Sequence, residues 1–297
     1  MISTALRYFL EAVDSGTIAE AAQRLHVAPS AVSRMIRKLE EEHGVTLIER
    51  RPRGIVPSEA GTLLAEYGRR VILDSERTRA DILELSTAGQ RTIRVATNQA
   101  FGTELMPNII ARMQSHDPSL VFHLSIFQSE IINERVREGK EDIGITHDMS
   151  RPKGVDILHQ SSAPLYAVMS ATHELAHEKE VTFQAVQKYP VALMSKGSTN
   201  RLTVDMCALA EGVTLEPSLT TNNVSAIQNY CRMHGAISFF SRVTVSSSIA
   251  RGELRAVRLA SKHPGKRFFH IQAMTGRELP KSVLRLVETL RTELTDI

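Results

Sequence analysis

Apolar residues near the N-terminus recur at helical spacing in two neighbouring segments. The apolar positions are Ala21, Ala22 and Leu25 in the first segment and Val32, Ile36 and Leu39 in the second. Pro29 suits the first turn of the second helix, where its missing N–H costs nothing. Ala22 is small enough for two helices to cross closely. Residues 17–43 are therefore predicted to form a helix, a tight turn and a second helix.

A short apolar alternation at 45–50 follows the second helix, then Arg51-Pro52-Arg53-Gly54 and the apolar residues 55–57. This pattern predicts a small β-hairpin with three arginines near its tip. Such a wing can reach the phosphate backbone or the minor groove of DNA.

The outward positions of the second helix carry short hydroxyls and long cations, the side chains that contact base edges and phosphates. They are Ser30, Ser33, Arg34, Arg37 and Lys38. A charged surface helix on a small bundle would show a similar pattern. The wing that follows favours a DNA-reading helix-turn-helix.

Overall charge contributes little to this prediction. The chain has a formal net charge of +3, and residues 1–58 hold eight Lys/Arg against seven Asp/Glu. DNA affinity would have to come from the placement of basic residues on the second helix and the wing.

The first sixty residues resemble the DNA-binding domain of LysR-type transcriptional regulators. The resemblance is carried by Leu6-Arg7-Tyr8-Phe9-Leu10, Gly16-Thr17, Ala21-Ala22, Leu25-His26-Val27, Pro29 to Arg34, Ile36 to Glu40, Gly44-Val45, Leu47, Glu49-Arg50 and Glu59-Ala60-Gly61. It implies an N-terminal all-α winged helix-turn-helix with a long linker helix. It also implies a C-terminal α/β sensor domain of two lobes resembling type 2 periplasmic binding proteins.

In this interpretation the chain is a transcriptional regulator without enzymatic activity that binds promoter DNA. The residues expected to read bases are Pro29, Ser30, Ser33 and Arg34. Phosphate contacts are expected from Arg37 and Lys38, and DNA contacts of the wing from Arg51 and Arg53. The family often has Ser-Gln-Pro where this chain has Ala28-Pro29-Ser30, so the operator preference is not carried over.

A long helix is predicted from Ser58, a suitable N-cap, to about Thr87. Its seam, apolar except for Ser75 and Thr78, averages about 3.5 residues per repeat, the period of a coiled coil. The seam comprises Ala60, Leu64, Tyr67, Val71, Ser75, Thr78, Ile82 and Leu85. A helix packed on its own domain is the alternative. The resemblance favours a homodimer through 59–87, a homotetramer through the sensor lobes, and contact with RNA polymerase.

Alternating strands and helices are predicted after residue 90, in a mostly parallel sheet covered by helices. The predicted strands are 92–97, 120–127, 142–146, 166–170, 191–194, 214–220, 237–240 and 268–275. The predicted helices are 103–114, 130–138, 182–188, 198–211, 224–234 and 280–294. The expected domains are 1–58, the winged helix-turn-helix; 59–87, the linker; and 88–297, the effector-binding domain, with lobe one at 91–162 plus 269–297 and lobe two at 163–268.

Four segments leave strands and enter helices on the expected ligand side of this domain. Free N–H groups at helix N-termini suit carboxylates and other anions, although Ser, Thr and Asn also begin helices simply as caps. The expected effector residues are Asn98, Gln99, Ala100, Phe101, Gln128, Ser129, Thr146, His147, Ser198, Thr199, Thr221 and Asn222. The predicted effector is a small polar, anionic metabolite, and an amide- or hydroxyl-rich molecule also fits.

Two other function classes compete with that of a regulator. His173-Glu174-Leu175-Ala176-His177 has the spacing of a zinc protease, but no long apolar helix surrounds it. A transport-type solute-binding protein would share the sensor fold, but not the first 90 residues. No metal or redox cofactor is expected.

The beginning of the chain has no basic region followed by an apolar run, so no signal peptide is predicted. No stretch of 18 apolar residues occurs, so no membrane span is expected. Cys207 and Cys231 are interpreted as reduced structural thiols. These observations predict a cytoplasmic protein.

Overall fold

The computed structural model describes residues 3–52, 54–85, 90–261 and 267–295. It divides into two compact units. One comprises Met1–Gly89 with Gly276–Pro280, and the other Gln90–Thr275 with Lys281–Ile297.

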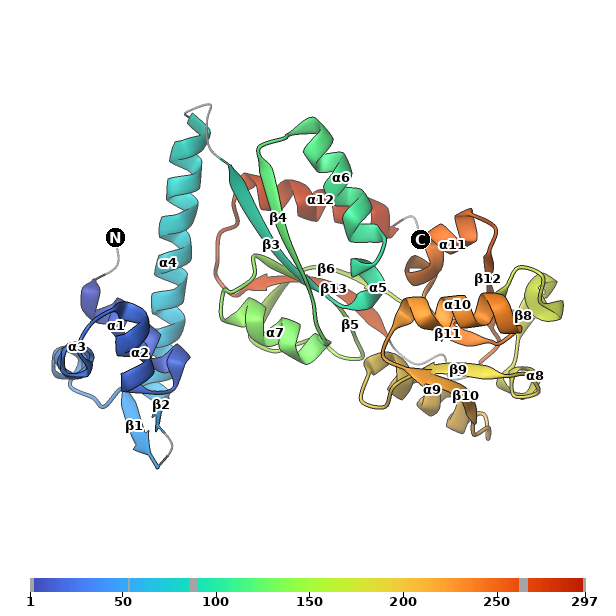
Figure 1. Ribbon diagram of the computed structural model, residues 1–297, viewed down its shortest axis with the longest axis horizontal. Coiled ribbons are helices and arrows are strands. Elements are labelled where there is room, and N and C mark those ends of the chain that lie inside the picture. The colour runs from blue at the N-terminus through green and yellow to red at the C-terminus, as the bar shows by residue number, and fades with distance from the viewer. Residues whose placement is uncertain (1–2, 53, 86–89, 262–266, 296–297) are drawn as a thin grey trace. The chain divides into compact units, whose positions relative to one another are not determined.

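Three helices form the start of the first unit: α1 (Thr4–Ser15), α2 (Ile18–Leu25) and α3 (Pro29–His43) (Figure 1). The Thr17 side chain caps α2, and His26 ends it in the left-handed conformation at φ 55°. Pro29 occupies the first turn of α3, as predicted. All six apolar positions predicted to face inward lie in or against one core with Phe9 and Leu10. The predicted helix-turn-helix is confirmed.

The predicted wing is the antiparallel hairpin of β1 (Ile48–Arg51) and β2 (Gly54–Pro57), with Arg51 opposite Gly54. Ile55 donates a backbone hydrogen bond to the carbonyl of Gly16. A Cβ on Gly54 would lie 2.3 Å from that same oxygen, so this close approach requires glycine. Arg53, predicted to act from the wing, lies outside the described residues.

The predicted linker helix is α4 (Glu59–Leu85). Ser58 precedes it, and its hydroxyl accepts a hydrogen bond from the N–H of Gly61. Of the predicted seam, Ala60 and Leu64 pack against the core of this unit, whereas Tyr67 is 52% and Ile82 61% exposed. The side chain of Leu85 lies outside the described residues.

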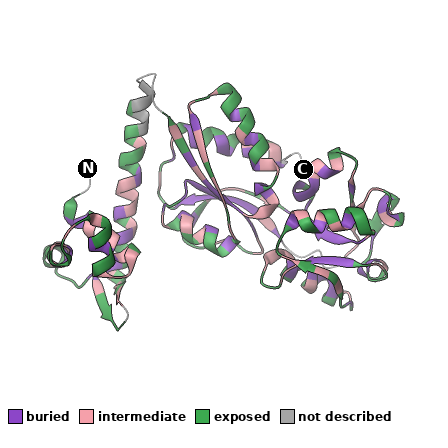
Figure 2. Ribbon diagram, in the orientation of Figure 1, coloured by how far each residue is buried: buried purple, intermediate pink, exposed green. Residues whose placement is uncertain are grey.

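The second unit contains two groups of strands. Lobe one has a five-stranded sheet in the order β4-β3-β5-β13-β6. Its strands are β3 (Arg91–Thr97), β4 (Leu120–Ile126), β5 (Ile143–Asp148), β6 (Val155–Ser162) and β13 (Phe268–Met274). In Figure 1, α6 (Leu105–His116) and α12 (Lys281–Thr295) lie on one side of this sheet and α7 (Ser129–Arg137) on the other. Figure 2 shows its central strands as mostly buried.

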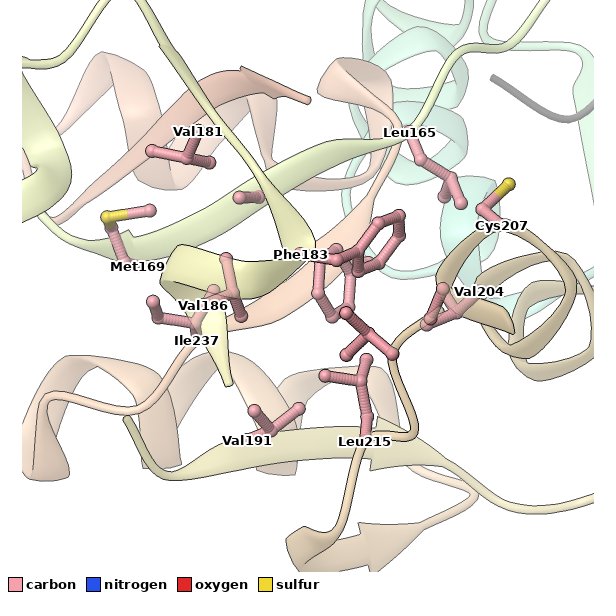
Figure 3. Packing of buried hydrophobic residues seen from close by; sticks show 14 of the residues in the cluster. Leu165, Met169, Val181, Phe183, Val186, Val191, Val204, Cys207, Leu215 and Ile237 are labelled. Carbon is pink, nitrogen blue, oxygen red and sulfur yellow. The ribbon is translucent and has the colours of Figure 1, made fainter. Parts of the chain in front are cut away.

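Lobe two has the sheet β11-β7-β12-β8 and the parallel pair β9 and β10, joined through a bridge between Val191 and Ile237. Its strands are β7 (Tyr166–Ser170), β8 (Glu180–Val181), β9 (Val191–Met194), β10 (Pro217–Thr221), β11 (Ser238–Phe240) and β12 (Leu254–Leu259). Its helices are α8 (Phe183–Val186), α9 (Thr199–Ala210), α10 (Val224–His234) and α11 (Ser246–Ala250), with 3₁₀ turns at Glu174–His177 and Arg242–Val245. Phe183 lies in the middle of the apolar cluster in Figure 3, and its ring is 5.3 Å from that of Phe239.

The two lobes contain more antiparallel strand pairs than the sequence pattern predicted. In lobe one only β4, β3 and β5 run parallel; β13 and β6 are antiparallel to their neighbours. The strands β6, β8 and β12 were not predicted. In lobe two, β7 pairs with β11 and β12 in antiparallel orientation. Single-segment patterns give no direction of pairing, because direction depends on partners far away in the chain.

The segment before α6 also differs from the prediction. A short helix, α5 (Gln99–Gly102), begins directly after β3, where the prediction placed a loop. The helix that follows begins at Leu105 rather than at Thr103. Asn98 thereby becomes the N-cap residue of α5.

Candidate functional site

The outward face of α3 presents the side chains predicted to read DNA. Ser30, Arg34, Arg37 and Lys38 are exposed, and Ser33 is half-buried. Lys38 lies 3.8 Å from Glu42, while Arg34 and Arg37 form no ion pair with any described residue. Their guanidinium groups are therefore available to phosphates or base edges.

Arg51 differs from the cations of α3, because it is paired within the wing. Its Nη2 lies 2.6 Å from a carboxylate oxygen of Glu49. An exposed pair of this kind is weak, so a phosphate can displace the carboxylate.

The first unit also has an apolar groove along α4, which we call the linker groove. It is lined by Leu63, Tyr67 and Val71 of α4 together with Leu6, Leu39, Val45 and Leu47. Leu63 is 65% exposed. The groove is therefore a surface that a second apolar helix can cover.

Within the second unit, a cavity of about 430 Å³ is lined from both lobes. This volume is ordinary for a small-molecule pocket. Nine of the twelve predicted effector residues line it: Asn98, Gln99, Ala100, Gln128, Ser129, His147, Ser198, Thr199 and Asn222. The carboxyl ends of several strands thus bring together loops that are far apart in the sequence.

The other three predicted effector residues lie outside the lining, so the structure does not bring them together with the nine. The side chain of Phe101 is fully buried and stacks on His147, with ring centroids 4.6 Å apart. Thr146 is also buried and donates a hydrogen bond to Asp148. The Thr221 hydroxyl accepts from the N–H of Asn223 in the turn before α10. Thr146 and His147 are neighbours on β5, so their side chains point to opposite faces.

Sequence reasoning missed several lining residues, above all Arg267, along with Phe240 and Thr244. Arg267 directly precedes β13, and its side chain is only 4% exposed. Burial lowers its pKa to about 10, which leaves the guanidinium charged at neutral pH. No sequence motif marks this residue; only the pairing of β13 with β5 brings it to the cavity.

His147 is a buried polar residue on the cavity wall. Burial lowers its pKa well below the ordinary histidine value, and the charges of Arg267 and His270 act in the same direction. The imidazole is therefore neutral at neutral pH. Its Nε2 lies 3.4 Å from the hydroxyl of Ser241.

In the described part of the chain, three helices of eight residues or more begin at the cavity: α7, α9 and α10. No side chain caps α7, and Ser198 caps α9 by accepting from the N–H of Arg201. At α10 the first N–H belongs to Val224 and is taken by the side-chain oxygen of Gln99. The positive ends of these helix dipoles favour a negatively charged ligand in the cavity.

Two family models match the chain, and together they cover nearly all of it. The bacterial regulatory helix-turn-helix model of the lysR family matches residues 3–62, and the LysR substrate binding domain model matches residues 86–295. The chain belongs to the LysR family. It is a LysR-type DNA-binding transcriptional regulator with a substrate-binding domain.

Curated relatives of this LysR-type regulator are named HTH-type transcriptional regulators. It is 26% identical over 235 residues to the HTH-type transcriptional regulator CysB of Haemophilus influenzae, covering 77% of this chain and 72% of CysB. It is 29% identical over 259 residues to the uncharacterized HTH-type transcriptional regulator YeiE of Escherichia coli K12, covering 85% and 84%. Because these relatives are regulators, the interpretation of the chain as a regulator rather than an enzyme is confirmed.

Solved structures of the family share the fold. ArgP from Mycobacterium tuberculosis gives a TM-score of 0.68 at 19% identity, covering 98% of this chain and 97% of ArgP. Full-length CbnR complexed with its target DNA gives 0.56 at 19% identity, covering 98% and 99%. The predicted fold class of winged helix-turn-helix and periplasmic-binding-like sensor is confirmed.

The zinc-protease alternative finds no structural support. His173 and His177 lie at a 3₁₀ turn, where Tyr189 packs edge-on against the His173 ring. Among the described residues, no group of three or more His, Cys, Asp or Glu side chains could hold a metal ion. No described helix is long and apolar enough to cross a membrane.

Proposed function

We propose that this LysR-type regulator reads its operator through α3 and the wing, and that the cavity of the second unit binds a small anionic effector. The observation that supports the first part is the exposed row of Ser30, Arg34 and Arg37 on α3. A recognition helix in the major groove uses its N-terminal residues on base edges, which places Pro29, Ser30, Ser33 and Arg34 nearest the bases. Arg37, Lys38, Arg51 and Arg53 would contact phosphates.

The observation that supports the second part is the cavity itself. Its lining combines the beginnings of three helices with a buried guanidinium, a combination that suits an anion. An effector bound by both lobes would stabilise one lobe arrangement over another, by as much as its affinity for the two arrangements differs. Through that shift it would control DNA binding.

A homodimer through 59–87 belongs to the same proposal, with the linker groove covered by a second copy of the chain. A dimer presents two recognition helices to two half-sites and implies a pseudo-palindromic operator. Tetramers through the sensor domain and contact with RNA polymerase follow from the family resemblance.

Operator reading is tested with DNA that the wild-type full chain selects from a random pool. Arg34→Ala should cost about 1–3 kcal/mol on the selected sequence, measured by fluorescence anisotropy. The exposed Arg79 of α4 supplies a charge-matched control, Arg79→Ala. Equal affinity of wild type and Arg34→Ala for the selected DNA would refute the docking of α3.

Effector binding is tested by thermal unfolding of the full chain against carboxylates, amino acids, sugars and nucleosides. A compound present at about 100 times its Kd should add about 2.7 kcal/mol, which shifts the midpoint measurably. Thr199 lines the cavity, so Thr199→Val should weaken that shift. If the midpoint shift persists in both Thr199→Val and Gln128→Ala, the ligand binds outside the cavity.

A further inference from the structure

Arg267 differs from the other basic side chain in the described lining of the cavity, Lys196. Lys196 is exposed, whereas Arg267 is buried. Both Nε and Nη1 of Arg267 are buried and have no hydrogen-bond partner among the described residues. A charged group with two nitrogens that lack hydrogen-bond partners therefore lies in the wall of a cavity large enough for a small molecule.

An unpaired buried guanidinium is costly, because it loses its water without gaining an acceptor. Its charge persists at neutral pH, since burial lowers its pKa only to about 10. His147 cannot balance this charge, because the imidazole is neutral or positive and never negative. The one acidic residue in the described lining, Glu130, is exposed at the beginning of α7.

We propose that Arg267 is the charge anchor of the cavity, and that the effector is a small monocarboxylate whose two oxygens accept hydrogen bonds from its guanidinium. This inference rests on the ligand-binding function proposed above and specifies its chemical class. The planar fork of Arg matches a carboxylate through two parallel N–H···O bonds. One buried positive charge balances one negative charge; a dianion such as phosphate would leave its second charge to the helix dipoles and to Lys196, which is exposed to water.

A second unpaired atom narrows the ligand class further. The side-chain oxygen of Asn98 is buried without a hydrogen-bond partner, and Asn98 lines the same cavity. An oxygen of this kind accepts from a hydroxyl or an ammonium group. The carboxylate therefore carries a hydroxyl or amino substituent, as 2-hydroxy acids and amino acids do.

Arg267 also lies where the chain passes between the lobes. Its carbonyl accepts a hydrogen bond from the N–H of Ala163, at 2.9 Å, and these residues belong to the two crossing segments. Pairing with a carboxylate therefore acts at the junction of the lobes, where a small change in backbone position alters their relative arrangement.

The test compares the full chain with Arg267→Met, using calorimetric unfolding. Without ligand, Arg267→Met should raise the midpoint of the second unit by about 2–4 °C, because it removes an unpaired buried charge. The exposed Arg255 on β12 supplies the control, Arg255→Met, which should leave the midpoint unchanged.

The ligand panel for the same experiment contains short 2-hydroxy and 2-amino monocarboxylates, their primary amides, sulfate and inorganic phosphate, each at millimolar concentration. At least one carboxylate should raise the midpoint of wild type and of Arg255→Met, while its amide does not. The same carboxylate should lose at least tenfold in affinity for Arg267→Met. The substitution Asn98→Leu should also weaken the binding of this carboxylate.

Several results would overturn the inference. If sulfate or phosphate raises the unfolding midpoint of wild type more than any carboxylate does, the ligand is a different oxyanion. If no carboxylate raises the midpoint, the effector is not a monocarboxylate. A lowered midpoint for ligand-free Arg267→Met would make Arg267 a structural residue. If an uncharged compound shifts wild type and Arg267→Met alike but not Thr199→Val, the cavity is a sensor and only the charge anchor is wrong.

Discussion

The side-chain oxygen of Gln99 accepts a hydrogen bond from the backbone N–H of Val224, with an N···O distance of 2.8 Å. Gln99 belongs to α5 of lobe one and Val224 begins α10 of lobe two. The bond satisfies one of the N–H groups that a helix N-terminus leaves without an internal partner. It therefore joins the two lobes across the cavity, at a position where a ligand would compete for the same N–H.

Removing this hydrogen bond should make local opening at the beginning of α10 more frequent. A neutral hydrogen bond contributes about 1 kcal/mol, so Gln99→Ala should speed hydrogen exchange of the Val224 amide about fivefold. Mass spectrometry of deuterated peptides from the full chain measures this. Gln184→Ala is the matched control, because Gln184 donates to the Glu211 carbonyl within lobe two. Unchanged exchange at Val224 in Gln99→Ala would show that the bond does not hold the lobes.

The linker groove should be the dimer contact. Leu63 and Tyr67 are exposed on α4, and covering them with a second copy buries apolar area at about 25 cal/mol per Å². The double substitution Leu63→Lys and Tyr67→Lys should convert a dimer to monomer in analytical ultracentrifugation. Val56→Lys, at an exposed apolar position of the wing, should not. Persistence of the dimer in the double variant would move the contact away from α4.

Acid should destabilise the second unit through His147. Its folded pKa lies well below the ordinary value, because burial and then the nearby positive groups disfavour the imidazolium. Below about pH 6.5 the unfolded chain binds a proton that the folded chain does not, so stability falls as pH falls. The loss from this one group is at most about 1.4 kcal/mol per pH unit.

The measurement is urea unfolding of the full chain between about pH 7.5 and about pH 5, the range in which a histidine with a lowered folded pKa gains a proton on unfolding. His147→Gln should flatten the pH dependence, although His159 and His173, whose pKa values burial also lowers, retain part of it. His123→Gln, at an exposed position of β4, is the control. A slope equal to that of wild type in His147→Gln would contradict the assignment.

The two cysteines should be chemically inert in the folded protein. Burial raises the pKa of Cys231 to about 12 and also raises that of Cys207. At pH 7 the thiolate fraction of Cys231 is then on the order of 10⁻⁵, and the thiolate is the reactive form. A disulfide-exchange reagent should label no thiol quickly in the native chain and two after unfolding. Rapid labelling of one native thiol would instead point to a redox-responsive cysteine.

The first unit could be predicted almost entirely from local sequence. Helical spacing, Pro29 at the beginning of α3 and the hairpin pattern after Gly44 are all encoded within a few residues. Such signals depend on neighbours along the chain, so they survive without knowledge of the tertiary fold.

The cavity was predictable only in part. Asn98, Ser129 and Ser198 follow strands and precede helices, and this order alone places them at one edge of a sheet. Whether a side chain such as Thr146 or His147 faces the cavity depends on the phase of the strand, which the sequence around β5 does not fix, because both faces of that strand are buried.

The sequence by itself therefore determined the family, the DNA-binding element and the class of sensor fold, since each rests on local spacing and on motifs within a continuous segment. The tertiary structure decided the antiparallel pairing of β13 with β5 and, with it, the position of Arg267 at the cavity beside His147. These two residues are separated by more than a hundred positions in the sequence. Their proximity is a consequence of strand pairing, which depends on long-range packing and hydrogen bonding rather than on any local pattern.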